Sequence, residues 1–292
     1  MEPLTKADRR AATDDFLERY EDASELLPGT GPLPYGTVLD IDSAAWSIPF
    51  IDEMVAGELR ELTNQLNQWM GALRRWHAWN DVLAGRDEQI RWAIEWEFVE
   101  PLAFQCMFQP SATRDRFTFV ATNALHQVHL AITPGHKDVL LGDPAHPADT
   151  KHYPNRRAKE KQLADMAKAW SPGLPFVGAL RKLDGEVNRK ATSDFRNRSS
   201  HAIAPRFSVG YTAIVTRRCA QANSLVPQPD GTYKDTPVPD KMAVSYGFGG
   251  TSPLGMQEAW QANLDQFNAG KRTFDAYVGL LAEAVSSMPR RT

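Results

Sequence analysis

The chain has few cysteines and no long hydrophobic run, which argues against a disulfide-stabilised protein and against a membrane-spanning one. None of the apolar stretches in its 292 residues approaches the roughly 18 residues that a transmembrane helix requires. Residues 1–20 are rich in charge and contain no hydrophobic signal core. The two cysteines, Cys106 and Cys219, are far apart and match no metal-ligand spacing, which favours reduced thiols. We therefore expect a cytoplasmic protein that neither spans a membrane nor depends on disulfides.

Charge is unevenly distributed along the chain, although the formal net charge is only −3. Residues 1–60 contain 13 acidic and 5 basic side chains, whereas residues 151–206 contain 13 basic and 5 acidic ones. A basic segment in a chain that is otherwise acidic is typical of a polyanion-binding face. Solvated helix surfaces explain the same numbers equally well, so charge alone leaves both interpretations open.

Apolar residues recur at helical spacing along most of the chain. Between residues 54 and 83 they fall at positions 59, 62, 66, 70, 73 and 76, which puts one apolar stripe along a helix. The same periodicity predicts further helices over residues 87–108, 111–132, 156–170, 175–198 and 256–285. We expect Pro101 to kink or split the first of these, and Pro110 to separate it from the next.

Two segments near residues 206–250 have the composition of strands. Residues 206–216 and 241–248 are rich in β-branched and aromatic side chains and flank a turn-rich stretch, which predicts an antiparallel pair. The predicted fold is therefore all-α, a bundle of long helices with a small two-stranded β-hairpin insertion. We expect residues 1–50 to form an acidic N-terminal helix and an extended arm. Residues 51–292 then form the bundle with its hairpin, as a single domain overall.

The sequence DFRNRSSHAIAP at residues 194–205 concentrates polar groups around the predicted end of the helix over 175–198. In a helix Asn197 lies one turn from His201, and the long Arg196 side chain can swing toward the imidazole. The group combines a residue type that titrates near neutral pH, a guanidinium fork suited to phosphate, and an amide. Metal-independent RNA cleavage needs these components, because a proton must move at the 2′-hydroxyl or leaving oxygen and charge must be stabilised on phosphorus.

This stretch resembles the signature of HEPN domains (higher eukaryote and prokaryote nucleotide-binding), which is Arg, a polar residue, three variable residues and His. Arg196, Asn197 and His201 fit that pattern. The resemblance implies an endoribonuclease of the toxin–antitoxin, host-defence or RNA-processing type. It also implies cleavage by 2′-hydroxyl attack without a metal or other cofactor, in a cleft formed by the motifs of two subunits.

By this resemblance Arg196 and His201 are catalytic, and Asn197 orients the histidine or the scissile phosphate. The expected partners are RNA, a second copy of the chain in a homodimer, and an antitoxin or regulatory protein, with no membrane. Basic residues nearby in the sequence are candidates for contact with the RNA backbone: Arg156, Arg157, Lys159, Arg189, Lys190 and Arg198.

Other interpretations of these residues remain open. A catalytically inactive HEPN-like module can bind a nucleotide or a protein in the same groove. Alternatively the motif is structural, with Arg196 and Arg198 paired to Asp194 or to a helix C-terminus, where cations are favoured. His126 and His129 lie three apart in a predicted helix, but no further zinc ligand stands out, so no metal site is predicted.

Overall fold

A computed structural model describes residues 3–26, 31–35, 40–146, 150 and 152–291. These residues are mostly helical and include one two-stranded antiparallel sheet, so the predicted helical class with a β-hairpin is confirmed. The chain divides into two compact units, residues 1–192 with 256–292, and residues 193–255. Among the residues described, no helix combines the length and the apolar content that crossing a membrane requires.

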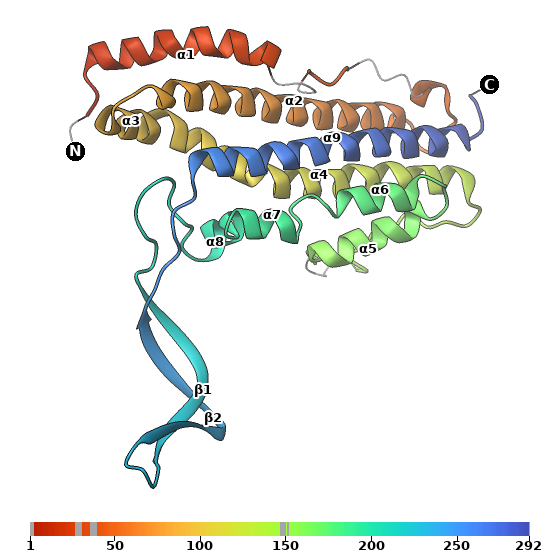
Figure 1. The fold of residues 1–292 in the computed structure, drawn as a ribbon. Coiled ribbons are helices and arrows are strands. Elements are labelled where there is room, and N and C mark those ends of the chain that lie inside the picture. Colours follow the sequence, from red (N-terminus) through yellow and green to blue (C-terminus); the bar gives the residue numbers. More distant parts are fainter. Residues whose placement is uncertain (1–2, 27–30, 36–39, 147–149, 151, 292) are drawn as a thin grey trace. The chain divides into compact units, whose positions relative to one another are not determined.

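Three long helices carry the core of the first unit. α2 (Ile51–Ala84), α4 (Glu100–Ile132) and α9 (Met256–Ser286) lie side by side, each in contact with the other two (Figure 1). The apolar stripe of α2 faces this contact, since Leu62 and Leu66 have no exposed surface. The periodicity over residues 54–83 and 256–285 thus predicted both helices correctly.

The predicted break at Pro110 is wrong, because α4 runs through this residue without interruption. Proline has no N–H to donate to the carbonyl four residues earlier, so Pro110 leaves the Cys106 carbonyl without its helical partner. Asn263 of α9 supplies one, since its Nδ2 donates to Cys106 O over 3.0 Å. Its Oδ1 accepts from Trp69 Nε1 of α2 over 2.7 Å. A buried amide from a distant part of the chain therefore satisfies the carbonyl that the proline orphans.

The predicted split at Pro101 takes the form of a π-helical turn. α3 (Glu88–Ile94) leads into a π-helix at Glu95–Val99, and Pro101 lies in the first turn of α4. The Glu100 N–H donates to the Glu95 carbonyl five residues earlier, so the wider π-helical hydrogen bonding directly precedes the proline. Phe98 of the π turn stacks on Trp79 of α2 with ring centroids 4.8 Å apart, which holds the turn against the core.

The acidic N-terminal segment forms α1 (Lys6–Leu26), which packs along α2. Arg9 Nε pairs with Glu97 Oε1 at 2.7 Å. The predicted extended arm lies partly outside the described residues. Within them, Leu33 exchanges two hydrogen bonds with the side-chain amide of Asn67, at 2.7 and 3.1 Å.

α5 (Arg156–Ala167) packs on α4, and α6 (Gly173–Leu180) packs on α9. A buried ion pair anchors α5. Nε and Nη2 of Arg114 donate to the two carboxylate oxygens of Glu160 over 2.6 and 2.9 Å, and Nη1 donates to the Leu183 carbonyl over 2.8 Å. The two charged side chains are only 13% and 8% exposed, so water screens this pair weakly.

The predicted single helix over residues 175–198 is wrong in its length. The structure divides this segment into α6, α7 (Glu186–Ala191) and α8 (Phe195–His201). Left-handed backbone interrupts the helix twice, once at Asp184 (φ 50°) and again at the neighbouring Ser193 and Asp194 (φ 49° and 54°). A right-handed helix needs negative φ at every residue, so no helix continues through these positions.

Tertiary contacts hold the first interruption in place. The backbone N–H of Asp184 donates to Gln266 Oε1 of α9 over 2.7 Å, and its carboxylate accepts from Arg156 of α5 over 2.7 Å. Val187 shows the consequence. It is one of the apolar residues whose spacing predicted a single helix over residues 175–198, and it was expected to face the core, but it is 84% exposed.

The second unit contains the antiparallel strands β1 (Val215–Pro227) and β2 (Tyr233–Phe248). The first strand lies later in the chain than predicted, because β1 overlaps the expected segment 206–216 only at Val215 and Thr216. Both strands run through the stretch that we expected to be a turn, where pairing continues from Asn223–Pro237 to Pro227–Tyr233. Prolines suggested a turn there, but a two-stranded ribbon tolerates proline because the outward N–H of each strand has no partner to lose. The pairing is irregular between Gln221 and Asn223.

Candidate functional site

α8, which carries the Arg–His motif, belongs to the second unit. It begins directly after the left-handed residues Ser193 and Asp194 and ends at His201. Phe195 anchors the helix, because it is 2% exposed and its ring centroid lies 5.1 Å from that of Phe207. The motif therefore lies on a short helix of its own, which corrects the expectation that it ends a long one.

Two polar side chains of the motif bind groups within the same unit. Asn197 Nδ2 donates to Asp194 Oδ2 over 3.0 Å. Arg198 donates from Nε to the Ile203 carbonyl over 3.0 Å and from Nη1 to Thr251 Oγ1 over 2.7 Å. The Asp194 carboxylate thus accepts from an amide, and Arg198 ties α8 to the segment that follows the hairpin.

Arg196 and His201 lack such contacts. His201 is exposed and Arg196 half-buried, and neither side chain forms a hydrogen bond or ion pair with the part of the chain that the structure describes. Consecutive helical residues advance about 100° around the axis, so five positions separate the two side chains by about 140°. The two side chains therefore leave the helix in different directions.

The guanidinium of Arg156, one of the predicted RNA contacts, is occupied by protein groups. Nε and Nη2 donate to the two Asp115 carboxylate oxygens over 2.7 and 2.8 Å, and Nη1 donates to Asp184 over 2.7 Å. Nη2 also donates to Ser111 Oγ over 2.6 Å. Burial alone lowers the pKa of Arg156, but the hydrogen bonds that it donates to the two carboxylates outweigh this effect and raise the pKa. Arg156 therefore links α4, α5 and the segment after α6, which leaves it little capacity to bind RNA.

The other basic candidates in the first unit are exposed: Arg157, Lys159, Arg189 and Lys190. Lys190 Nζ lies 2.8 Å from Glu186 Oε1, but both side chains are more than 70% exposed. A pair this exposed contributes little and separates readily. These four residues and the motif belong to different compact units.

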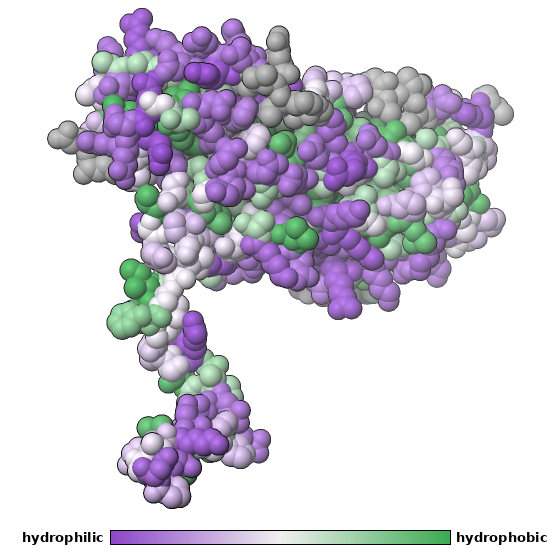
Figure 2. Space-filling view, in the orientation of Figure 1, coloured by the Kyte–Doolittle hydropathy of each residue, from purple (hydrophilic) through white to green (hydrophobic). Residues whose placement is uncertain are grey.

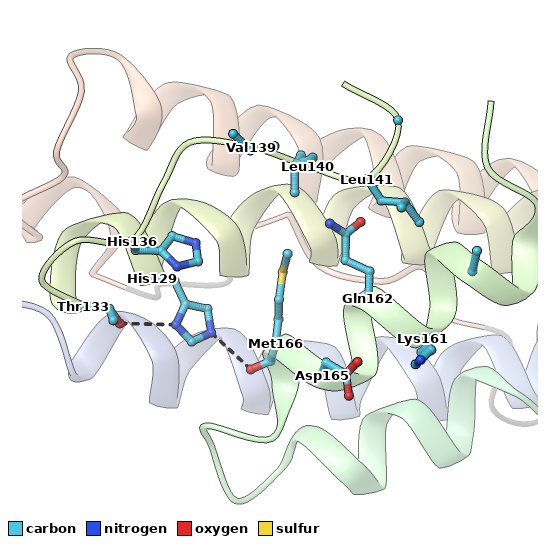
Figure 3. Close-up of a pocket in the computed structure, with 12 residues that line it drawn as sticks. His129, Thr133, His136, Val139, Leu140, Leu141, Lys161, Gln162, Asp165 and Met166 are labelled. Carbon is cyan, nitrogen blue, oxygen red and sulfur yellow. Dashed lines mark hydrogen bonds between the residues drawn. The ribbon is translucent and has the colours of Figure 1, made fainter. Parts of the chain in front are cut away.

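A pocket of about 1020 Å³ lies between the end of α4, the loop that follows it, and α5 (Figure 3). Residues 139–141 and Met166 provide apolar walls, and His129 and His136 present their imidazoles. His129 is held in place, because Nε2 donates to the Met166 carbonyl over 3.2 Å and Nδ1 lies 3.5 Å from the Thr133 hydroxyl.

A third histidine joins the two that the sequence singled out. His126 is 1% exposed, and its Nε2 lies 2.8 Å from Asp138 Oδ1. The carboxylate can only accept, so Nε2 of His126 carries a proton, and Nδ1 lies 3.3 Å from His136 Nε2. Partial burial, followed by the neighbouring imidazoles, lowers the pKa of His136. A neutral His136 ring has one unprotonated nitrogen with which to accept a hydrogen bond.

The sequence did not single out His136, because its position beside His126 depends on a turn that reverses the chain. The left-handed Gly135 (φ 75°) reverses the chain after α4 and brings His136 back to His126, ten positions earlier. Nothing in the spacing of the histidines signals this. Within the described ranges, no three His, Cys, Asp or Glu side chains are arranged to hold a metal ion.

A second pocket of about 360 Å³ shares residues 140–142 and Gln162 with the first. Its lining includes Phe119, Tyr153 and Lys159. Aromatic rings beside a cation suit a planar, anionic ligand such as a nucleotide.

No protein-family model, no curated protein and no solved structure matches this chain. A functional assignment therefore rests on the chemistry of its own residues. The motif offers an accessible cation and an accessible imidazole on α8, and the pockets offer a site for a small ligand between α4 and α5.

Proposed function

We propose that the protein is a cytoplasmic, metal-independent endoribonuclease of HEPN type, a helical bundle that acts in toxin–antitoxin defence or in RNA processing. The contrast within α8 carries the proposal. Asn197 and Arg198 donate hydrogen bonds to neighbouring protein groups. Arg196 and His201, the two residues that the resemblance makes catalytic, form no side-chain hydrogen bond or ion pair with the described residues, and RNA cleavage requires both groups.

The proposed reaction divides the work between these two residues. His201 takes the proton of the ribose 2′-hydroxyl or gives one to the leaving 5′-oxygen. The 2′-oxygen bonds to phosphorus as the bond to the 5′-oxygen breaks, and Arg196 stabilises the charge on the five-coordinate phosphorus. The products are a 2′,3′-cyclic phosphate and a free 5′-hydroxyl. Since the two side chains diverge by about 140° on one helix, His201 of one copy works with Arg196 of another.

Cleavage of a labelled RNA by the purified chain in excess EDTA tests the proposal. His201→Ala and Arg196→Ala should each lower the rate at least about 100-fold, the usual contribution of such groups. Ser200→Ala is the matched control, because Ser200 is exposed on the same helix and bonds only the Arg196 carbonyl, and it should cleave normally. Full activity of His201→Ala, or loss of wild-type activity in EDTA, would show the proposal to be wrong.

A nucleotide-binding module without cleavage is the second candidate. The pocket of about 360 Å³ favours it, because Phe119, Tyr153 and Lys159 line the same space. This function predicts that a mononucleotide raises the melting temperature, that Lys159→Ala removes the shift, and that RNA stays intact.

A further inference from the structure

The part of the hairpin next to residues 215 and 248 has one apolar and one polar face. Residues paired directly across an antiparallel ribbon share a face, and successive pairs alternate between faces. One face carries the pairs Val215–Phe248, Arg217–Tyr246, Cys219–Val244 and Gln221–Met242. The other face carries the pairs Thr216–Gly247, Arg218–Ser245 and Ala220–Ala243. The large apolar side chains thus gather on the first of these, which we call the apolar face.

The apolar face is open to solvent. Phe248, Tyr246 and Met242 are 91%, 71% and 62% exposed, and Val215 and Val244 are 58% and 47% exposed. Figure 2 shows hydrophobic residues along the hairpin. Apolar patches larger than a few hundred Å² mark interaction sites on soluble proteins, and a two-stranded hairpin without a partner is marginally stable in water. We therefore expect another molecular surface to bind and bury this face.

We propose that the apolar face binds the apolar face of a second copy of this chain, forming a two-fold symmetric dimer. Covered side chains of this size bury on the order of 100 to 200 Å² each, so the five supply about 600 Å² per chain. Two copies then bury about 1,200 Å², which reaches the lower end of the range for stable, specific interfaces.

The side-chain pattern fits a two-fold axis at the level of the Arg218–Ser245 pair, the centre of the four pairs that form the apolar face. An axis that lies in the interface and crosses the strands at right angles reverses them, so β2 of one copy packs on β2 of the other. Tyr246 then meets Val244 of the second copy, and Phe248 meets Met242. On β1, Arg217 meets Cys219 of the second copy, and Val215 meets Gln221. The apolar column therefore packs on itself without bringing two arginines together.

The low positive charge of the apolar face disfavours a nucleic acid as the partner that buries it. Binding to a polyanion requires several cations on one surface, and Arg217 is the single charged residue among the eight that form the apolar face. The ribonuclease proposal needs two copies but does not specify how they meet, so a dimer that forms through another surface would refute this proposal and leave the ribonuclease proposal standing. Dimer mass tests the surface, and RNA cleavage tests the enzyme.

Sedimentation equilibrium of the full chain tests the dimer with two matched variants. Tyr246→Asp and Ser245→Asp each put a carboxylate directly opposite an arginine, Arg217 and Arg218 respectively, and differ only in the face that carries it. We expect the wild type and Ser245→Asp to dimerise alike. Tyr246→Asp should raise the dissociation constant at least about 30-fold, as removal of a central interface anchor does. Circular dichroism checks folding, and Met242→Asp repeats the test if Tyr246→Asp fails to fold.

Thiol crosslinking gives a second readout. Packed sheets lie about 10 Å apart, so a bismaleimide of that reach should join the two Cys219 side chains. Cys106 will not compete, because it is buried and burial raises the pKa of its thiol to about 12. Tyr246→Asp should abolish the crosslinked dimer.

Three results would overturn the proposal. The first is a wild-type chain that stays monomeric at about 100 µM, a concentration at which even weak specific dimers form. The second is a dimer that Tyr246→Asp and Ser245→Asp weaken equally. The third is a monomer that binds RNA or lipid vesicles through this face, which would assign the surface to that partner instead.

Discussion

Replacing Asn263 by alanine should reveal how α4 accommodates its internal proline. The Asn263 side chain is 1% exposed, donates to the Cys106 carbonyl and accepts from the Trp69 indole N–H. Pro110 has already removed the helical partner of that carbonyl. Asn263→Ala therefore leaves a buried acceptor and a buried donor without partners in the middle of the α2–α4–α9 core.

The magnitude follows from those two groups. Each buried polar group that loses its partner costs about 1 to 3 kcal/mol, so the free energy of unfolding should fall by about 2 to 6 kcal/mol. Protein domains of this kind have total stabilities of about 5 to 15 kcal/mol, so the loss is a large fraction of the whole. Gln261→Ala is the control, because this amide of α9 is exposed and bonds only Asp265, and it should cost less than about 0.5 kcal/mol.

A double-mutant cycle with Pro110→Ala isolates the proposed compensation. Alanine at position 110 restores an N–H that can donate to the Cys106 carbonyl, so only the Trp69 indole then depends on Asn263. In this background Asn263→Ala should cost about 1 to 2 kcal/mol less than in the wild type. Urea unfolding followed by circular dichroism measures both costs. Equal costs in the two backgrounds would refute the argument that Asn263 replaces the hydrogen bond lost at Pro110.

Three further outcomes are expected. Glu160→Ala should lower the free energy of unfolding by about 3 to 5 kcal/mol, because it leaves the Arg114 charge buried without a partner; an unchanged urea midpoint contradicts this. Arg157→Ala should weaken RNA binding and reduce the slope of log K against log salt by about 0.7, because one phosphate contact is lost. Arg156→Ala should instead lower the free energy of unfolding and leave that slope unchanged, and filter binding over a salt series separates the two effects. The pKa of His136 is lowered in the folded protein, so as the pH falls the unfolded chain binds a proton at this residue before the folded protein does. Protonation therefore favours unfolding, and the folded protein loses stability as the pH falls from 6.5 to the lower pKa of the folded state. Melting temperatures between about pH 5 and 7.5 should accordingly depend less on pH in His136→Gln, and a wild-type profile in that variant would show that His136 does not titrate in this way.

Local sequence pattern predicted the elements whose stability is itself local. The apolar repeats over residues 54–83 and 256–285 correspond to α2 and α9, because a continuous stripe at helical spacing can only be buried along one side of a helix. An antiparallel pair was also predicted, but its first strand was placed at residues 206–216 and lies at Val215–Pro227. The function stays a prediction, since six residues carry the resemblance and α8 is shorter than the helix expected to present them.

Contacts between residues far apart in the sequence determine the features that local pattern did not predict. Cys106 receives its substitute donor from a residue 157 positions away, and Asp184 is held in left-handed backbone by Gln266, 82 positions away. His136 became a member of a histidine cluster only because Gly135 reverses the chain. Propensity and periodicity sum over neighbouring residues, whereas these hydrogen bonds come from helices that only the folded chain brings close.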